Sequence, residues 1–232
     1  MHLFYSTNIS NNSITLDNEE SKHLAKVLRL EIGDKVHVID GKGTRYLCYI
    51  DLAHQKATQL TIIEKKLVNE TYRIEIAAAP TKNLNRWEWF LEKTTEIGID
   101  AIHPIVSFHS ERKVLKKDRQ ERILVSAMKQ SYKTKLPVLS ELEKFKQFIT
   151  RYFDGRKFIC HCYDDLPKKS LTESYKKGEK ALLLIGPEGD FSKEEVQLAL
   201  QHGFEPIALG ESRLRTETAA IVACHTIHVL NA

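Results

Sequence analysis

Two loops near the C-terminal end of the chain combine glycines with charged residues. Residues 185–190 read IGPEGD and follow an apolar run. Residues 209–218 read LGESRLRTET and precede a second apolar run. Both loops are expected to follow strands, and open α/β sheets bind ligands at the carboxyl ends of strands. Glycine there lets bare backbone approach a flat ring or a ribose. Each loop alone would fit an ordinary turn between strand and helix, but together they indicate a small-molecule site.

The first of these loops also holds a carboxylate. Glu188 could accept hydrogen bonds from a ligand or hold its loop by bonding nearby backbone amides.

Other site motifs are missing from the sequence. There is no G-x-G-x-x-G, no phosphate-binding G-x-x-x-x-G-K-[ST] and no H-E-x-x-H. Residues 160–162, Cys-His-Cys, are expected to alternate across a strand, so their side chains cannot converge on one metal. Residues 224–228 place two histidines one turn apart, but their ligand number and spacing are poor for zinc and favour packing of an apolar helix. No metal site is therefore expected.

The basic residues are concentrated in one segment. The net charge is +4, and residues 111–135 hold nine basic and three acidic residues, a local balance of +6. Such a segment suits a polyanion, because neutralising phosphates drives non-specific binding of nucleic acid. A solvated lysine-rich helix and loop is the alternative.

Residues 1–70 are predicted to form a small β-rich domain. Residues 35–40, 46–52 and 59–63 are rich in β-branched and aromatic residues, and glycines turn the chain between the first two runs. One short helix is expected between Asp17 and Leu28. Several short strands with one helix favour a small barrel.

Residues 71–232 are predicted to be α/β, because strands alternate with helices as in a mostly parallel sheet. Ser192 and Glu195 form a capping box at the start of one helix, and Gly98 is expected to end another. The expected strands are residues 73–79, 101–106, 157–162, 181–185 and 206–209. The expected helices are residues 85–97, 119–131, 142–152, 192–203 and 217–230.

The composition indicates an ordinary globular protein, with 42% hydrophobic and 28% charged residues. No apolar run approaches the roughly 20 residues that span a bilayer, so no membrane association is expected. The first ten residues do not resemble a signal peptide. Four scattered cysteines fit reduced thiols. A cytoplasmic protein is expected.

The two loops also carry a resemblance. LLLIGPEGDFSKEE (182–195) with LGESRLRTETA (209–219) resembles the 16S rRNA uridine-N3 methyltransferases, often called RsmE, of the SPOUT class. HLAKVLRLEIGD (23–34), WEWFLEKTTEIGI (87–99) and MKQSYKTKLP (128–137) match in the same order. Asp190 stands where the family usually has a second glycine, and residues 210–213 also depart from its pattern. Because Asp tolerates left-handed backbone, we expect a local adjustment at Asp190.

The resemblance implies a fold and a cofactor. The fold is a PUA-like RNA-binding β-barrel (1–70) followed by a SPOUT α/β methyltransferase domain (71–232) with a C-terminal trefoil knot. S-adenosyl-L-methionine would lie bent in the knot. The residues implied to surround the cofactor are Leu184, Ile185, Gly186, Pro187, Glu188, Gly189, Leu209, Gly210, Leu214 and Thr218.

The resemblance further implies methylation of N3 of a specific uridine in 16S rRNA of the small ribosomal subunit, by a homodimer. Arg215 and Glu217 would be the catalytic residues. Arg215 stays protonated and presents several donors, so it would stabilise negative charge on the uracil. Glu217 would orient this arginine or accept a proton, with Glu188 as the weaker alternative. The structural alternative is an ion pair of Arg215 and Glu217 at a helix start, which contributes little. The expected RNA contacts are Lys26, Arg29, Arg112, Lys113, Lys116 and Lys117. Two alternatives stay open: a SPOUT 2′-O-ribose methyltransferase, and an RNA-binding ribosome-assembly protein without catalysis.

Overall fold

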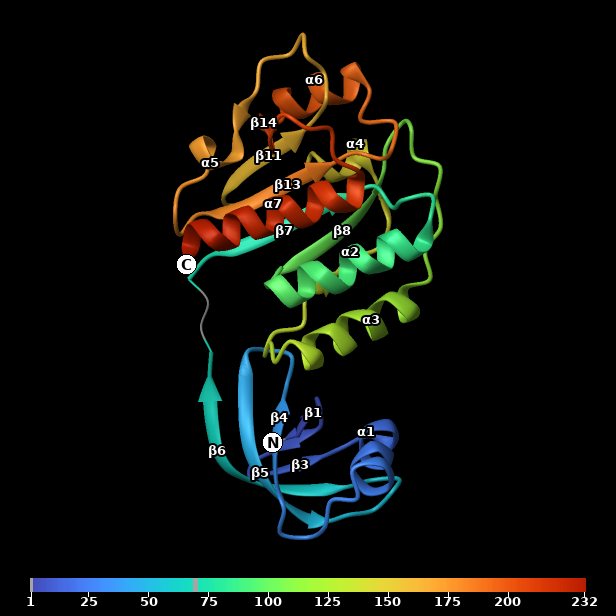
Figure 1. The fold of residues 1–232 in the computed structure, drawn as a ribbon, viewed down its shortest axis with the longest axis vertical. Helices are drawn as coiled ribbons and strands as arrows, with labels where there is room; N and C mark the ends of the chain where they lie inside the picture. Colours follow the sequence, from blue (N-terminus) through green and yellow to red (C-terminus); the bar gives the residue numbers. More distant parts are fainter. Residues whose placement is uncertain (1, 69–70) are drawn as a thin grey trace. The chain divides into compact units, whose positions relative to one another are not determined.

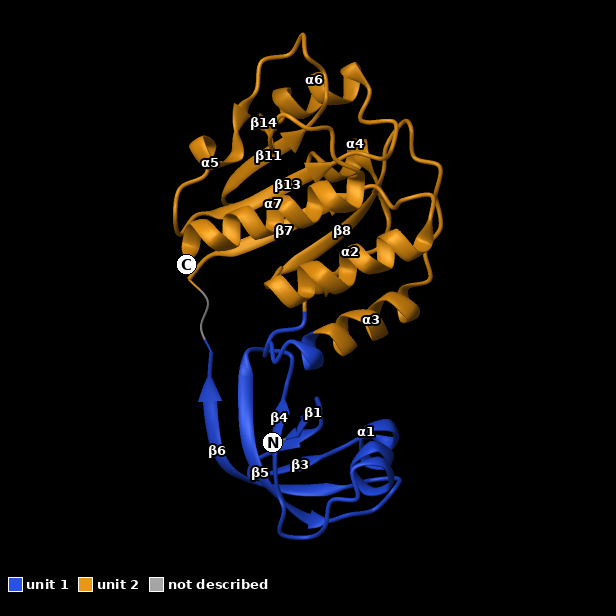
Figure 2. Cartoon of the chain, viewed as in Figure 1, with its two compact units in different colours: residues 1–69, 128–136 blue, residues 70–127, 137–232 orange. Residues whose placement is uncertain are grey.

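The computed structural model describes residues 2–68 and 71–232, which belong to two compact units (Figure 2). Unit 1 comprises residues 1–69 and 128–136, and unit 2 comprises residues 70–127 and 137–232. The expected boundary at residue 70 lies outside the described residues. The structure adds residues 128–136 to the N-terminal unit, a return of the chain that no local pattern in the sequence indicates.

Unit 1 is built on one six-stranded sheet with the order β1-β4-β5-β6-β3-β2. Its strands are β1 (Leu3–Tyr5), β2 (Ile9–Ser10), β3 (Ser13–Thr15), β4 (Lys35–Ile39), β5 (Thr44–Leu52) and β6 (Gln59–Leu67). The three longer strands confirm the predicted ones. The first three strands have two or three residues each, too few to show an alternating pattern, and were not predicted.

The core of unit 1 follows from alternation along its longer strands. Val36 and Val38 on β4, Cys48 and Ile50 on β5, and Leu60 on β6 are all buried. The single predicted helix is instead a short α-helix, α1 (Asn18–Lys22), which continues into a π-helix, η1 (His23–Val27). Both lie beside this sheet.

Unit 2 contains an eight-stranded sheet in which every pair is parallel. Its order is β10-β8-β7-β13-β11-β14-β12, and β9 also pairs with β8. The strands are β7 (Arg73–Ala78), β8 (Ala101–Val106), β9 (Val138–Leu139), β10 (Glu143–Lys144), β11 (Arg156–Cys160), β12 (Lys169–Ser170), β13 (Lys180–Ile185) and β14 (Glu205–Ala208). β13 is central and continuously apolar after its first residue, as expected of a strand covered on both faces.

Helices cover both faces of this sheet. On one face α2 (Leu84–Ile97) packs against α7 (Thr216–Asn231), which lies over β7 and β13 (Figure 1). On the other face α4 (Phe145–Phe148) and α6 (Lys193–Gln201) pack on Leu182 and Leu184 of β13. The predicted α/β class is therefore confirmed, and the trefoil knot stays a prediction.

Helix ends agree with the sequence at several points. Ser192 and Glu195 form both hydrogen bonds of the capping box, and Gly98 ends α2 with φ 121°. The predicted helix 142–152 was wrong in length: residues 143–144 pair as β10, which leaves only the one turn of α4.

The remaining helices of unit 2 are α3 (Lys117–Gln130) and α5 (Leu171–Ser174). The last residues of α3, from Met128 on, belong to unit 1. The helix α5 was not predicted, although Ser170 and Glu173 form a capping box at its start. None of the helices in the described ranges has the length and apolar character needed to cross a membrane.

Candidate cofactor site

A cavity of about 580 Å³ opens at the carboxyl edge of the sheet in unit 2. It lies where three neighbouring strands end, because the loops after β11, β13 and β14 line it. The lining residues are Cys160, His161, Cys162, Asp164, Lys168, Ile185, Gly186, Pro187, Glu188, Asp190, Ile207, Ala208, Leu209, Gly210, Glu211, Ser212, Arg213, Leu214, Arg215, Thr216 and Ala219. The two loops that the sequence singled out thus share one cavity.

The loop after β13 is tight at Gly186. A Cβ on this residue would lie 3.0 Å from the backbone nitrogen of Phe191 and 3.2 Å from the carbonyl carbon of Asp190. The loop folds back on itself because the Asp190 N–H donates to the carbonyl oxygen of Pro187 at 2.9 Å. Gly186 therefore fits because the returning backbone fills the space of a side chain.

Asp190 joins this loop to the loop after β11. Its φ is 65°, in the left-handed region, which Asp tolerates better than most residues. Its Oδ1 accepts from the N–H of Phe191 at 2.8 Å, and its Oδ2 accepts from the N–H of Cys162 at 2.8 Å. The Asp190 side chain thus supplies two hydrogen bonds that a glycine at this position could not form.

The loop after β14 is tied to the loop after β13 through a threonine. The buried hydroxyl of Thr216 donates to the carbonyl oxygen of Gly186 at 2.9 Å. Gly210, with φ 142°, gives this loop a backbone conformation that other residues rarely adopt. Two polar side chains, Asp190 and Thr216, therefore hold all three loops together.

His161 is the most unusual residue of the cavity lining. Its side chain is 6% exposed, and neither ring nitrogen has a hydrogen-bond partner within residues 2–68 and 71–232. Burial, followed by the charge of Lys168, keeps the pKa of His161 below its ordinary value. His161 was missed because the sequence placed residues 157–162 in one strand. β11 in fact ends at Cys160, so His161 and Cys162 belong to the loop, and the expectation that they alternate within a strand was wrong.

The structure separates the two proposed catalytic residues. Arg215 is exposed, lines the cavity and occupies the N-cap position of α7. Glu217 is 6% exposed, is not part of the lining, and its Oε1 lies 3.7 Å from Nε of Arg86 on α2. Glu188 does line the cavity, and its Oε1 accepts from the N–H of Lys82 at 3.0 Å.

Seven of the ten expected cofactor residues line the cavity, namely Ile185, Gly186, Pro187, Glu188, Leu209, Gly210 and Leu214. The other three do not. Leu184 is fully buried in the core beneath the site. A Cβ on Gly189 would lie 3.0 Å from that of His109, so this glycine faces the loop after β8. Thr218 follows in the first turn of α7.

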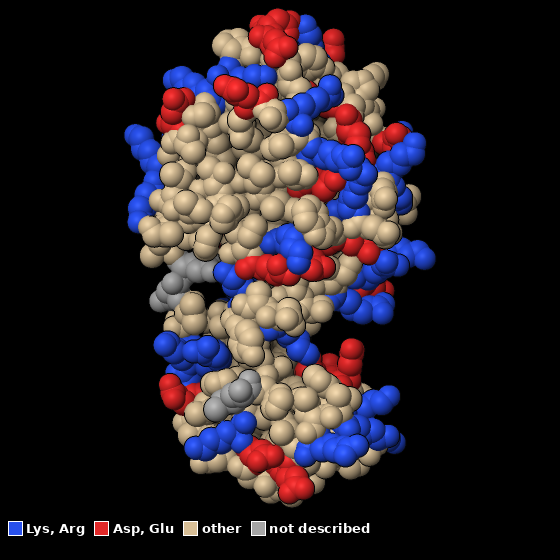
Figure 3. Space-filling model, in the orientation of Figure 1, with Lys and Arg blue, Asp and Glu red and all other residues tan. Residues whose placement is uncertain are grey.

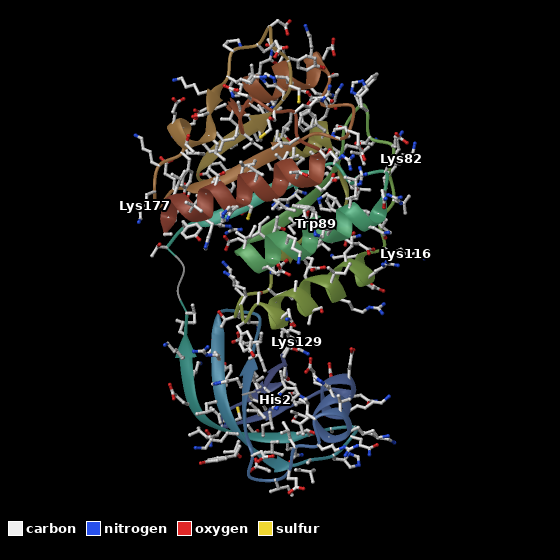
Figure 4. The ribbon with its side chains drawn as sticks, viewed as in Figure 1. His2, Lys82, Trp89, Lys116, Lys129 and Lys177 are labelled. Carbon is white, nitrogen blue, oxygen red and sulfur yellow. The ribbon has the colours of Figure 1, made fainter. Side chains whose placement is uncertain are left out.

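The six residues expected to contact RNA differ in whether they already have a partner within the protein. Arg112 donates to the carbonyl oxygens of Thr81 at 3.1 Å and Lys82 at 2.6 Å. Lys117 pairs with Glu141 at 2.6 Å. The remaining expected contacts are exposed: Lys26 and Arg29 in unit 1, and Lys113 and Lys116 in unit 2. Figure 4 shows Lys82 and Lys116 at the same edge of unit 2, where α2 and α3 begin.

His228 on α7 has a hydrogen-bond partner within the protein. Nδ1 of His228 lies 2.6 Å from the hydroxyl oxygen of Tyr72. Within the described ranges no three His, Cys, Asp or Glu side chains cluster as metal ligands.

The cavity suits a cofactor with a flat ring and a ribose. Its volume falls within the range of about 300–1,000 Å³ that small-molecule sites occupy. Ile185, Ile207 and Leu209 supply apolar surface, and Gly186 and Gly210 supply bare backbone. Glu188 and Asp190 add acceptors, and Arg213 and Arg215 add donors. The donors, acceptors and apolar walls fit S-adenosylmethionine.

Both units of the chain match families of known proteins. Residues 68–228 match a family described as an RNA methyltransferase domain, and residues 16–62 match an RNA methyltransferase PUA domain. The chain is 31% identical over 228 residues to ribosomal RNA small subunit methyltransferase E of Synechocystis, covering 94% of this chain and 73% of the relative. It is 30% identical to the protein of the same name from Aquifex aeolicus, covering 95% and 96%.

Solved structures show the same arrangement. A probable rRNA-methyltransferase from Porphyromonas gingivalis superposes with a TM-score of 0.92 and 40% identity, covering 100% of this chain and 98% of the other. A methyltransferase from Legionella pneumophila, solved with the bound cofactor SAM, superposes with a TM-score of 0.85 and 27% identity, covering 99% and 97%.

Proposed function

The chain belongs to the RNA methyltransferase family, and from this we propose that it methylates N3 of a uridine in 16S rRNA of the small ribosomal subunit, with S-adenosylmethionine as methyl donor. The observation that carries the proposal is the cavity shared by the GPEG and LRTETA loops, with Arg215 at its lining. The fit of its donors, acceptors and apolar walls to the cofactor supports the methyl donor. The names of the relatives support the RNA class.

The reaction needs an N3 atom that has lost its proton. When bound, S-adenosylmethionine supplies an electrophilic methyl group on a positively charged sulfur. Uridine N3 is a weakly acidic imide nitrogen, so the protein must position the base, accept its proton and favour the anion. The N3 lone pair then forms the N–CH₃ bond as the S–CH₃ bond breaks, and the bond electrons stay on sulfur.

Arg215 is our choice for stabilising the uracil anion. Its exposed guanidinium lies at the cavity, and arginine can donate to a carbonyl oxygen on which negative charge develops. Glu217 follows two residues later. Its side chain is buried and its carboxylate lies near Arg86 of α2, so we assign it to fixing the start of α7 and thereby the position of Arg215. The carboxylates in the cavity lining are Asp164, Glu188, Asp190 and Glu211, and Glu188 is our choice of proton acceptor.

The proposed RNA contacts are Lys26, Arg29, Arg112, Lys113, Lys116 and Lys117, which would bind phosphates. Because Arg112 holds the backbone at residues 81–82, we assign it also to positioning the loop beside Glu188.

We further propose a homodimer that acts in the cytoplasm. The surface over α7 carries few charged side chains (Figure 3). Trp89 on α2 is 45% exposed and Val229 on α7 is 54% exposed. This face supports a subunit interface, because exposed apolar surface of this kind marks contact sites.

The deciding experiment is methyl transfer from radiolabelled S-adenosylmethionine to small ribosomal subunits from cells that lack this protein, followed by nucleoside mass analysis. We expect N3-methyluridine. Ribose-methylated nucleosides would favour the 2′-O-methyltransferase alternative. Cofactor binding without transfer would mean that the RNA substrate is wrong, and absence of cofactor binding would favour an RNA-binding assembly protein.

A further inference from the structure

Tyr132 occupies a backbone position that normally requires glycine. It follows the end of α3 with φ 56°. Its N–H donates to the carbonyl oxygen of Lys129 at 3.2 Å, and the N–H of Lys133 donates to that of Met128 at 3.0 Å. These two bonds define a Schellman motif in which Tyr132 is the left-handed residue. A side chain at this position costs free energy that glycine would avoid.

Nothing in the described chain compensates for this strain. The Tyr132 side chain is 60% exposed. Within residues 2–68 and 71–232 its hydroxyl forms no hydrogen bond and its ring packs on no other aromatic ring. A strained residue that the fold does not use is a reason to look for function. The exposed ring is therefore available to a partner outside this chain.

The turn that carries Tyr132 is fixed to unit 1. The N–H of Gly43 donates to the carbonyl oxygen of Thr134 at 3.0 Å, and the N–H of Leu136 donates to that of Gly41 at 2.9 Å. One turn before the ring, Lys129 pairs with the buried carboxylate of Glu20. The ring is thus presented by the rigid β-domain of unit 1 and is not part of a free loop.

The surroundings of the ring are basic. Lys133 follows it directly, and the exposed Lys135 pairs through the backbone with Lys42, which is also exposed. An aromatic ring among lysines is how proteins bind single-stranded nucleic acid, because any base can stack on the ring while the cations attract the phosphates. This combination favours RNA over an apolar protein partner.

We propose that Tyr132 is a stacking platform for an unpaired base of the RNA substrate. The inference rests on the proposed function for the identity of the RNA as ribosomal, but binding can be measured without methyl transfer. Stacking on one ring is worth about a five- to hundredfold change in affinity.

The test uses the full-length protein, a single-stranded oligouridylate and deproteinised 16S rRNA. Tyr132→Gly and Tyr132→Asn remove the ring and relieve the backbone. We expect a higher melting temperature with about tenfold weaker RNA binding. Tyr132→Phe keeps ring and strain, and should bind like the parent. Tyr152→Ala, which removes a 90% exposed tyrosine of unit 2, is the matched control and should change neither quantity.

Salt dependence separates stacking from charge. Tyr132→Gly should weaken binding equally at every salt concentration, whereas Lys42→Glu should reduce the slope of log affinity against log salt. Parent-like affinity of Tyr132→Gly, or Tyr132→Phe as weak as Tyr132→Gly, would overturn the proposal. So would a change in oligomeric state, because the ring would then contact a second copy. Failure of methyl transfer by the parent protein would overturn only the proposed function.

Discussion

The carboxylate of Asp190 accepts a hydrogen bond from the backbone N–H of Cys162 at 2.8 Å. The bond joins the loops after β13 and β11, both of which line the cavity. Because Asp190 also holds the left-handed conformation at φ 65°, one residue both turns its own loop and fixes its neighbour. The geometry of the cofactor site therefore depends on a side chain where a glycine would be sufficient for the turn alone.

Replacement of Asp190 should separate these two tasks. Asp190→Ala loses both hydrogen bonds and keeps the strain, so we expect about 1–3 kcal/mol less stability and weaker cofactor binding. Asp190→Asn keeps one acceptor and should lose least, and Asp190→Gly should fall between them. Urea unfolding and calorimetry with S-adenosylmethionine measure the two effects. Asp165→Ala, which breaks an exposed pair with Lys193, is the control. Equal stability of Asp190→Ala and the parent would contradict the role of the bonds.

Local patterns in the sequence predicted most of the α/β unit. The apolar run of β13 and the capping box at Ser192 are each complete within a few neighbouring residues, so they are visible without a structure. The pairing of Lys135 with the turn at Gly41 and Lys42 joins residues far apart in the chain, and no local pattern marks it. For the same reason the very short strands, such as β9 and β12, were not predicted.

The sequence predicted only part of the site, because only some of its residues can be recognised locally. The glycines and charged residues of the two loops can be recognised by their residue types, and most of them line the cavity. The contribution of His161 depends on β11 ending one residue before it, and strand ends are poorly defined by sequence. The bond from Thr216 to Gly186 depends on the approach of two loops in space. The sequence shows the threonine of LRTETA, but it does not show that the carbonyl oxygen of Gly186 is the hydrogen-bond partner.

The Thr216 hydroxyl should matter for both stability and cofactor binding. Thr216→Val keeps the shape but leaves the buried carbonyl of Gly186 without its donor, so we expect a loss of about 1–3 kcal/mol and weaker binding of S-adenosylmethionine. Thr216→Ser keeps the hydroxyl and should restore most of both. Thr218→Val is the matched control from the same helical turn. If Thr218→Val weakens cofactor binding more than Thr216→Val does, the assigned link between the loops is wrong.

His161 should make the protein less stable in mild acid. Its pKa in the folded state is lowered by burial and by Lys168, so the unfolded chain binds a proton more readily. Stability is therefore lost as the pH falls from about 6.5 toward the lower pKa of the folded state. His161→Phe should reduce the difference in unfolding free energy between pH 7.5 and pH 5.5. His225→Gln, at an exposed position of α7, is the control variant. An unchanged pH difference in His161→Phe would refute the assignment.

Two carboxylates should differ in their effect on catalysis. Glu188 lies at the cavity, so Glu188→Gln should lower kcat by about a hundredfold or more if it accepts the N3 proton. Glu217→Gln should lower kcat less than tenfold, because the amide has the shape of the carboxylate and can still hold the start of α7 beside Arg86. Single-turnover rates as a function of pH, with cofactor affinity measured beside them, distinguish the two. A larger loss in Glu217→Gln would make Glu217 the proton acceptor.

Charge reversal of exposed lysines should weaken RNA binding without affecting the cofactor. We choose Lys26, Lys113 and Lys116, because Arg112 and Lys117 have partners within the protein. In Lys26→Glu/Lys113→Glu/Lys116→Glu the affinity for 16S rRNA should fall, and the slope of log affinity against log salt should decrease by about two to three, since each phosphate contact contributes roughly 0.7–0.9.

The control for this variant reverses the charge of three different exposed lysines, which all lie in unit 2: Lys146, Lys169 and Lys176. It has the same change in net charge, so any general effect of charge on RNA binding appears in both proteins. Filter binding at several salt concentrations gives the slopes, and calorimetry gives the affinity for S-adenosylmethionine, which should be the same in all three proteins. Equal slopes in the two reversed variants would show that net charge, and not this set of lysines, governs RNA binding.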